Sequence, residues 1–131
     1  MTPQAARFLE KAQKLLAEAD IMIKVNLADA AGRNAYLSGF HAAQAFIFER
    51  IGKSPKTHTG VQAEFLRLTK DDLDIGSLRG FLSRAYNLKA LADYETGPGS
   101  EISLERATQA VADGKSFIAY LKSRLEVERP R

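Results

Sequence analysis

The segment from residue 29 to residue 51 constrains the fold more than any other part of the chain. It reads DAAGRNAYLSGFHAAQAFIFERI, and its apolar residues cover nearly the whole circumference of a helix. A helix of this kind must be covered by other helices on several sides. The sequence therefore predicts a central helix, with one apolar stripe at the three-and-four spacing formed by Tyr36, Phe40, Ala43, Ile47 and Ile51.

Three more long helices and one short helix are predicted around this central helix. The last helix is expected to bury Leu104 in its apolar stripe, and Leu78 is assigned to the fourth helix. The ends of the helices follow from capping and breaking residues. In chain order these are Thr2 and Pro3, a break at residues 25–29, Gly52, Thr57 or Thr59, Tyr94 before the segment ETGPGS, and Ser103.

The predicted fold class is all-α. Sustained period-two alternation, which would indicate strands, is absent, and short connections between long helices favour antiparallel neighbours. We therefore expect an up-and-down antiparallel bundle of four main helices plus one short helix. The 131 residues fit a single domain over residues 1–131, with a core of about residues 3–126.

Composition excludes several classes of protein. The chain has no cysteine, which excludes disulfides, thiolate chemistry and cysteine-based zinc sites. It shows neither a membrane-spanning apolar run nor a signal peptide, so we expect a cytoplasmic location without membrane attachment. The net charge of +3 is too small to require a nucleic acid as partner. The signatures of a phosphate loop, a zinc helix and a serine nucleophile are absent, so we expect no metal and no cofactor.

Arg33 and His41 are candidate catalytic residues, because both are polar side chains within the apolar central helix. In a ribonuclease, a histidine would move the proton of the 2′-hydroxyl and an arginine would stabilise the phosphorane. Their spacing gives about 12 Å of rise and about 80° of rotation, so they are not neighbours on one face. The structural alternative is that both side chains satisfy carboxylates such as Asp93 or Glu95.

Two further segments contain candidate ligand-binding residues. Lys56 and His58 lie in KTHTG, where a helix start would attract anions. The simpler interpretation is a capping loop with a solvent-facing histidine. The other segment contains Lys89, Asp93 and Tyr94, near the end of the fourth helix. There we favour a structural pair between Asp93 and Arg33 over catalysis, since a charge in such a core needs a partner.

These residues resemble the HEPN superfamily, and more narrowly its small stand-alone UPF0332-like group. The resemblance rests on RNAYLSGFHAAQAF, on KTHTGVQAEF, and on NLKALADYE followed by a long last helix, and it covers residues 5 to 125. It implies a bundle of four or five helices, a homodimer, and a minimal nucleotidyltransferase as partner. Nuclease members of the superfamily carry Arg, four to six residues and His in a late helix. Here that stretch has Asp93 and no histidine, so the nuclease site is not transferred.

Three hypotheses for the function follow. The first is a non-catalytic HEPN-like module that binds nucleotide or RNA, as half of a toxin–antitoxin-like pair with a nucleotidyltransferase. The second is a metal-independent ribonuclease toxin that uses Arg33 with His41 or His58. The third is a purely structural dimerisation domain.

Overall fold

The computed structural model describes residues 1–99 and 101–127, and within these ranges it is helical without strands. The charged tail, for which fraying is expected after Glu126, lies outside the described residues from position 128 on. The helices are α1 (Pro3–Lys24), α2 (Ala28–Ile51), α3 (His58–Leu68), the 3-10 helix η1 (Gly76–Gly80), α4 (Phe81–Tyr94) and α5 (Leu104–Val127).

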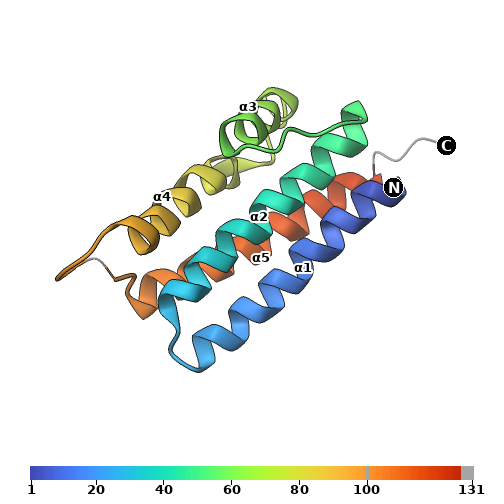
Figure 1. Ribbon diagram of the computed structural model, residues 1–131. Helices are drawn as coiled ribbons and strands as arrows, with labels where there is room; N and C mark the ends of the chain where they lie inside the picture. The colour runs from blue at the N-terminus through green and yellow to red at the C-terminus, as the bar shows by residue number, and fades with distance from the viewer. Residues whose placement is uncertain (100, 128–131) are drawn as a thin grey trace.

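The α2 helix is the centre of the bundle, as the sequence predicts. It packs against α1, α3, α4 and α5, and its contact with α1 is the most extensive in the molecule. Figure 1 shows α1, α2 and α5 side by side, with α4 along another side of α2 and α3 near the end of α2. Successive long helices run in opposite directions, which confirms the antiparallel all-α bundle (Figure 1).

Capping side chains explain where the helices begin and end. Thr2 accepts a hydrogen bond at Oγ1 from the backbone N–H of Ala5 at 3.2 Å, and Pro3 occupies the first helical position. Thr57 caps α3 in the same way, which settles the choice between the two threonines. Gly52 ends α2 at φ 77°, a left-handed conformation that favours glycine.

A layer of phenylalanine rings joins the helices at the core. Phe46 of α2 contacts Phe65 of α3, which contacts Phe117 of α5, and Phe117 stacks on Phe81 of α4 with centroids 4.8 Å apart. All four rings are almost completely buried. Full burial of such a side chain contributes about 1.5–3 kcal/mol, so this layer is a main source of stability.

Two sequence predictions about the helices are wrong. Leu78 lies in η1 rather than in α4, because the chain makes a 3-10 turn before Phe81. Leu104 is 43% exposed, because it is the first residue of α5 and lies beyond the end of the packed stripe.

Among the described helices, none combines the length and apolar character needed to span a bilayer.

Candidate functional site

A carboxylate shared by two cations forms the first part of the candidate site. Arg33 on α2 binds Asp93 on α4 through Nε and Oδ1 at 2.7 Å, which confirms the predicted pair. Lys89, one turn before Asp93, binds Oδ2 of the same carboxylate at 2.8 Å. Hydrogen bonds from Lys89 and then from Arg33 hold the pKa of Asp93 below its usual range. The three side chains therefore carry a net charge of +1 at neutral pH.

A second part consists of three aromatic rings from three helices. His58, the first residue of α3, stacks on Tyr86 of α4 with ring centroids 3.9 Å apart and an interplanar angle of 15°. Its Nδ1 lies 2.8 Å from the hydroxyl of Tyr36 on α2. Burial, and then the charge of Tyr86, raise the pKa of Tyr36 to about 12, so this hydroxyl stays protonated and can donate to Nδ1 of neutral His58. In that arrangement neutral His58 carries its own proton on Nε2.

Burial lowers the pKa of His58, and the nearby Lys89 lowers it further, while a hydrogen bond with Gln62 opposes both effects. His58 is consequently a neutral ring at neutral pH. The prediction of a solvent-facing histidine is wrong, because the start of α3 directs the ring between Tyr36 and Tyr86.

Lys89 connects the two parts of the site. Its Nζ lies 5.9 Å from the ring centroid of Tyr86 and 5.7 Å from that of Tyr94, within the range of cation–π contacts. Tyr94 is 72% exposed, whereas the side chains of Lys89 and Asp93 are about one fifth exposed. We name this arrangement the α2–α4 cluster, and it consists of Arg33, Tyr36, His58, Tyr86, Lys89, Asp93 and Tyr94.

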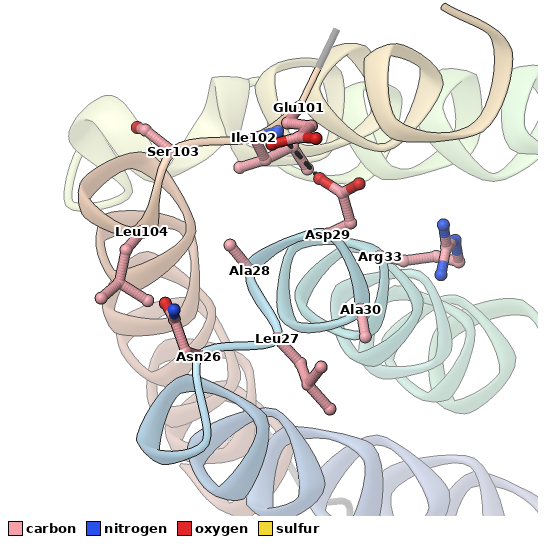
Figure 2. Close-up of a pocket in the computed structure, with 10 residues that line it drawn as sticks. All are labelled: Asn26, Leu27, Ala28, Asp29, Ala30, Arg33, Glu101, Ile102, Ser103 and Leu104. Carbon is pink, nitrogen blue, oxygen red and sulfur yellow. Dashed lines mark hydrogen bonds between the residues drawn. The ribbon is translucent and has the colours of Figure 1, made fainter. Parts of the chain in front are cut away.

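Helical spacing places the members of the cluster on matching faces. Arg33 and Tyr36 are three residues apart on α2, and Tyr86, Lys89 and Asp93 follow at steps of three and four on α4. The start of α2 is fixed by Asp29, whose Oδ1 accepts a hydrogen bond from the backbone N–H of Ile102 at 2.8 Å. Figure 2 shows this bond, with Arg33 at the edge of a cavity of about 570 Å³.

The structure brings together five of the seven residues proposed from the sequence. His41 and Lys56 lie apart from them and line a separate cavity of about 650 Å³. His41 binds the side-chain oxygen of Gln44 through Nδ1 at 2.8 Å, so the expectation that it satisfies a carboxylate is wrong. Within the described residues, His, Asp and Glu side chains form no group of three that could hold a metal ion.

Sequence reasoning missed the two tyrosines at the centre of the cluster. The apolar pattern places Tyr36 in the stripe of the central helix, and it gives Tyr86 no functional role. The available signal was the spacing of Tyr86 from Lys89, which puts a ring beside a cation on one helical face. Chemically, the cluster offers an excess cation, hydrogen-bond donors and an exposed aromatic ring, a combination suited to a phosphate carrying a base.

Comparison with known proteins places the chain in a family. The model of the HEPN domain matches residues 5–124. A UPF0332 protein of Archaeoglobus fulgidus is 30% identical over 127 residues, which cover 92% of this chain and 94% of the relative. Two proteins of Methanocaldococcus jannaschii are each described as a "putative toxin". One is 29% identical, and the match covers 90% of this chain and 86% of the relative. The other is 28% identical, and the match covers 91% of this chain and 80% of the relative. The chain therefore belongs to the HEPN domain family.

Proposed function

We propose that the chain is a toxin-like HEPN module that binds the phosphate of RNA or of a nucleotide at the α2–α4 cluster. The observation that carries the proposal is that Arg33 and Lys89 share the single carboxylate of Asp93. A phosphate can take hydrogen bonds from both cations, and charge-assisted bonds of this kind are about twice as strong as neutral ones. The relatives described as putative toxins fit a role in RNA or nucleotide biology.

The aromatic part of the cluster suits the base that accompanies a phosphate. The ring of Tyr94 is exposed and lies beside Lys89, so a base can stack there while the phosphate contacts the ammonium group. Stacking on an aromatic ring contributes about 1–3 kcal/mol per base in single-stranded nucleic-acid binding. His58 and Tyr86 adjoin this surface, because their rings stack on each other and Nζ of Lys89 lies 5.9 Å from the ring centroid of Tyr86.

Fluorescence anisotropy with a labelled single-stranded RNA of mixed sequence tests this proposal. We expect Lys89→Ala to weaken binding about fivefold at low salt, because one phosphate contact is lost. Lys115→Ala is the matched control, since Lys115 of α5 pairs with Asp20 of α1 at 2.8 Å, on other helices. Equal affinities for the two variants, or no binding by the wild type, would contradict the proposal. Competition by AMP then distinguishes a nucleotide site from an RNA site.

We further propose a homodimer and a minimal nucleotidyltransferase partner, as the family resemblance implies. Large apolar side chains are exposed where α1 ends, in the connection to α2 and at the start of α5, and such groups mark interaction surfaces. They are Ile21, Val25, Leu27 and Leu104, exposed by 60%, 59%, 53% and 43%.

Co-purification with a nucleotidyltransferase encoded beside the gene tests this partnership. Leu27→Glu should weaken the complex, because it places a charge within the exposed apolar group. Leu73→Glu is the control, since Leu73 is 93% exposed in the connection between α3 and η1. If the complex tolerates Leu27→Glu as well as Leu73→Glu, the partner does not dock at this end of the bundle.

One observation favours a second candidate function, a metal-independent ribonuclease. Nε2 of His41 has no hydrogen-bond partner among the described residues, so neutral His41 can accept a proton there. Arg33 lies about 12 Å from His41 along the axis of α2. The two side chains could therefore act together only on an RNA substrate long enough to extend over that distance. Cleavage of mixed RNA in EDTA by the wild type, lost in a folded His41→Ala variant, would support this function. No cleavage would exclude it.

A further inference from the structure

A cavity that His41 lines has the features of a second binding site. It lies between the first turns of α1, the second half of α2 and the loop between α2 and α3, and its volume is about 650 Å³. Phe8, Phe40 and Phe48 line it, and the rings of Phe8 and Phe48 have centroids 6.3 Å apart. These rings offer an apolar surface to a ring of similar size.

The charged residues that line this cavity are both cations. Lys53 and Lys56 contribute them from the loop, and the set of lining residues includes no carboxylate. Lys11 of α1 adds a third positive charge that acts on His41. Two acidic side chains of the neighbouring elements have partners of their own. Glu64 binds Arg67 at 2.6 Å and also feels the charge of Lys53, and Glu49 accepts from the backbone N–H of Thr2. An anion would therefore enter a positive field.

His41 is held in one orientation by a chain of hydrogen bonds. Gln44, which is 95% buried, donates from Nε2 to the carbonyl oxygen of Pro55 at 3.0 Å. Its side-chain oxygen must then accept from Nδ1–H of His41, at 2.8 Å. Neutral His41 consequently keeps a lone pair on Nε2. Because the same bonds tie α2 to the loop that carries Lys53 and Lys56, they also fix that loop against α2.

We propose that this cavity binds a small organic anion with an aromatic ring, an aryl carboxylate or aryl phosphate. The ring lies on the phenylalanines, the anionic group lies between Lys53 and Lys56, and His41 donates a hydrogen bond to it once Nε2 is protonated. The lining residues of this cavity are not members of the α2–α4 cluster, so the proposal does not depend on phosphate binding at that cluster.

Protonation of His41 gives the proposal a specific signature. Burial and the charge of Lys11 lower the pKa of the free side chain, although the bond to Gln44 opposes them. A bound anion would counter the repulsion from Lys11 and favour a second proton on His41, at Nε2. Binding should therefore raise the pKa of His41 and tighten as the pH falls toward that pKa.

NMR of the two histidine rings tests the proposal, because His41 and His58 are the only histidines of the chain. The probes are phenylacetate, phenyl phosphate and benzyl alcohol, which share one ring and differ in the attached group. We expect both anions to shift the His41 signals and raise its pKa, with an affinity in the millimolar range typical of such small ligands. Benzyl alcohol should produce neither effect. A preference between the two anions identifies the carboxylate or the phosphate as the natural group.

The double variant Lys53→Gln and Lys56→Gln supplies the decisive comparison, because both side chains are exposed and the fold does not depend on them. We expect roughly a fivefold loss of affinity for the anions in this variant, and no loss in Lys115→Gln. Inorganic phosphate is the remaining probe. If it shifts the NMR signals of His58 and not those of His41, phosphate binds at the α2–α4 cluster. Anion-induced shifts of His41 that are equal in the double variant and the wild type, or absent in both, would overturn the proposal.

Discussion

The neighbours of the two histidines favour opposite tautomers of the neutral rings. When the hydroxyl of Tyr36 donates to Nδ1 of His58, the neutral ring keeps its proton on Nε2. Gln44 accepts from Nδ1 of His41, because its amide nitrogen is committed to Pro55, so this ring keeps its proton on Nδ1. A single donor or acceptor beside each ring thus decides which nitrogen is available for a ligand.

Tyr36→Phe should raise the pKa of His58 and leave that of His41 unchanged. The hydroxyl of Tyr36 can donate only to a neutral imidazole, so its removal takes away a bond that favours the neutral form. We also expect a loss of stability of about 1 kcal/mol, typical of one buried hydrogen bond. NMR titration of both rings checks the pKa values, with His41 as the internal control. An unchanged pKa of His58 would show that the tyrosine does not control this ring.

Asp93→Asn should have opposite effects on stability and on anion binding. Its carboxylate pairs with both Arg33 and Lys89, so we expect a destabilisation of about 1 kcal/mol or less, given the partial exposure of the pair. Phosphate binding should instead strengthen, because the competing carboxylate is gone. Urea denaturation and RNA anisotropy measure the two effects, and a variant that binds RNA more weakly would contradict the proposed role of Asp93.

The pH dependence of this variant follows from the lowered pKa of Asp93. A carboxylate whose pKa is depressed in the folded state stabilises the fold above its unfolded pKa of about 3.9. That contribution is lost as the pH falls through the folded pKa. The stability difference between the wild type and Asp93→Asn should therefore be present at neutral pH and disappear in strong acid.

At the scale of elements, small residues let α2 sit between several helices. Gly39 is the closest case, because a Cβ there would lie 2.4 Å from Cε2 of Phe81 on α4. Phe81 is itself fixed by stacking on Phe117, so the ring has little room to move. The approach of α2 to α4, on which the α2–α4 cluster depends, thus requires a residue without a side chain at this position.

Gly39→Ala should destabilise the protein by about 1–2 kcal/mol. Overpacking a core typically costs about 1–3 kcal/mol, and the better helix propensity of alanine recovers up to about 1 kcal/mol. Urea denaturation measures the difference, with Ser116→Ala as the control because Ser116 is exposed on α5. A stability equal to that of the control variant would mean that Phe81 moves aside.

The sequence predicts the helices better than it predicts the site, for physical reasons. Helix ends depend on local residues such as Thr2 and Gly52, and the all-round apolar pattern of α2 reveals its central place. The pair of Arg33 with Asp93 was also predictable, since an arginine in an apolar helix needs an opposite charge. Tyr36 and Tyr86 were not, because a tyrosine on an apolar stripe resembles any core residue. The two tyrosines contact His58, and the position of His58 is set by the conformation of the loop after Gly52.

At the scale of the whole molecule, the two histidines couple stability to pH. Both have a pKa below the ordinary value of 6.5, each chiefly because of burial. A group whose folded pKa is depressed binds more protons when the chain unfolds, so acid favours unfolding. The stability that each histidine contributes is present above about pH 6.5 and is lost as the pH falls through its folded pKa. The two contributions act in the same direction although the rings lie on different sides of α2.

The free energy of unfolding should therefore decrease between neutral pH and about pH 5, before the carboxylates begin to titrate. Urea denaturation at a series of pH values measures it for the wild type and for the single variants His41→Gln and His58→Gln. Each single variant should show a shallower decrease than the wild type, and the double variant should be nearly flat over this range. Each substitution should reduce the slope of the free energy of unfolding against pH, and the two reductions should add in the double variant, because the rings bind different partners. A double variant as steep as the wild type would show that other groups produce the pH dependence, and that the histidines keep the same pKa in the folded and unfolded chains.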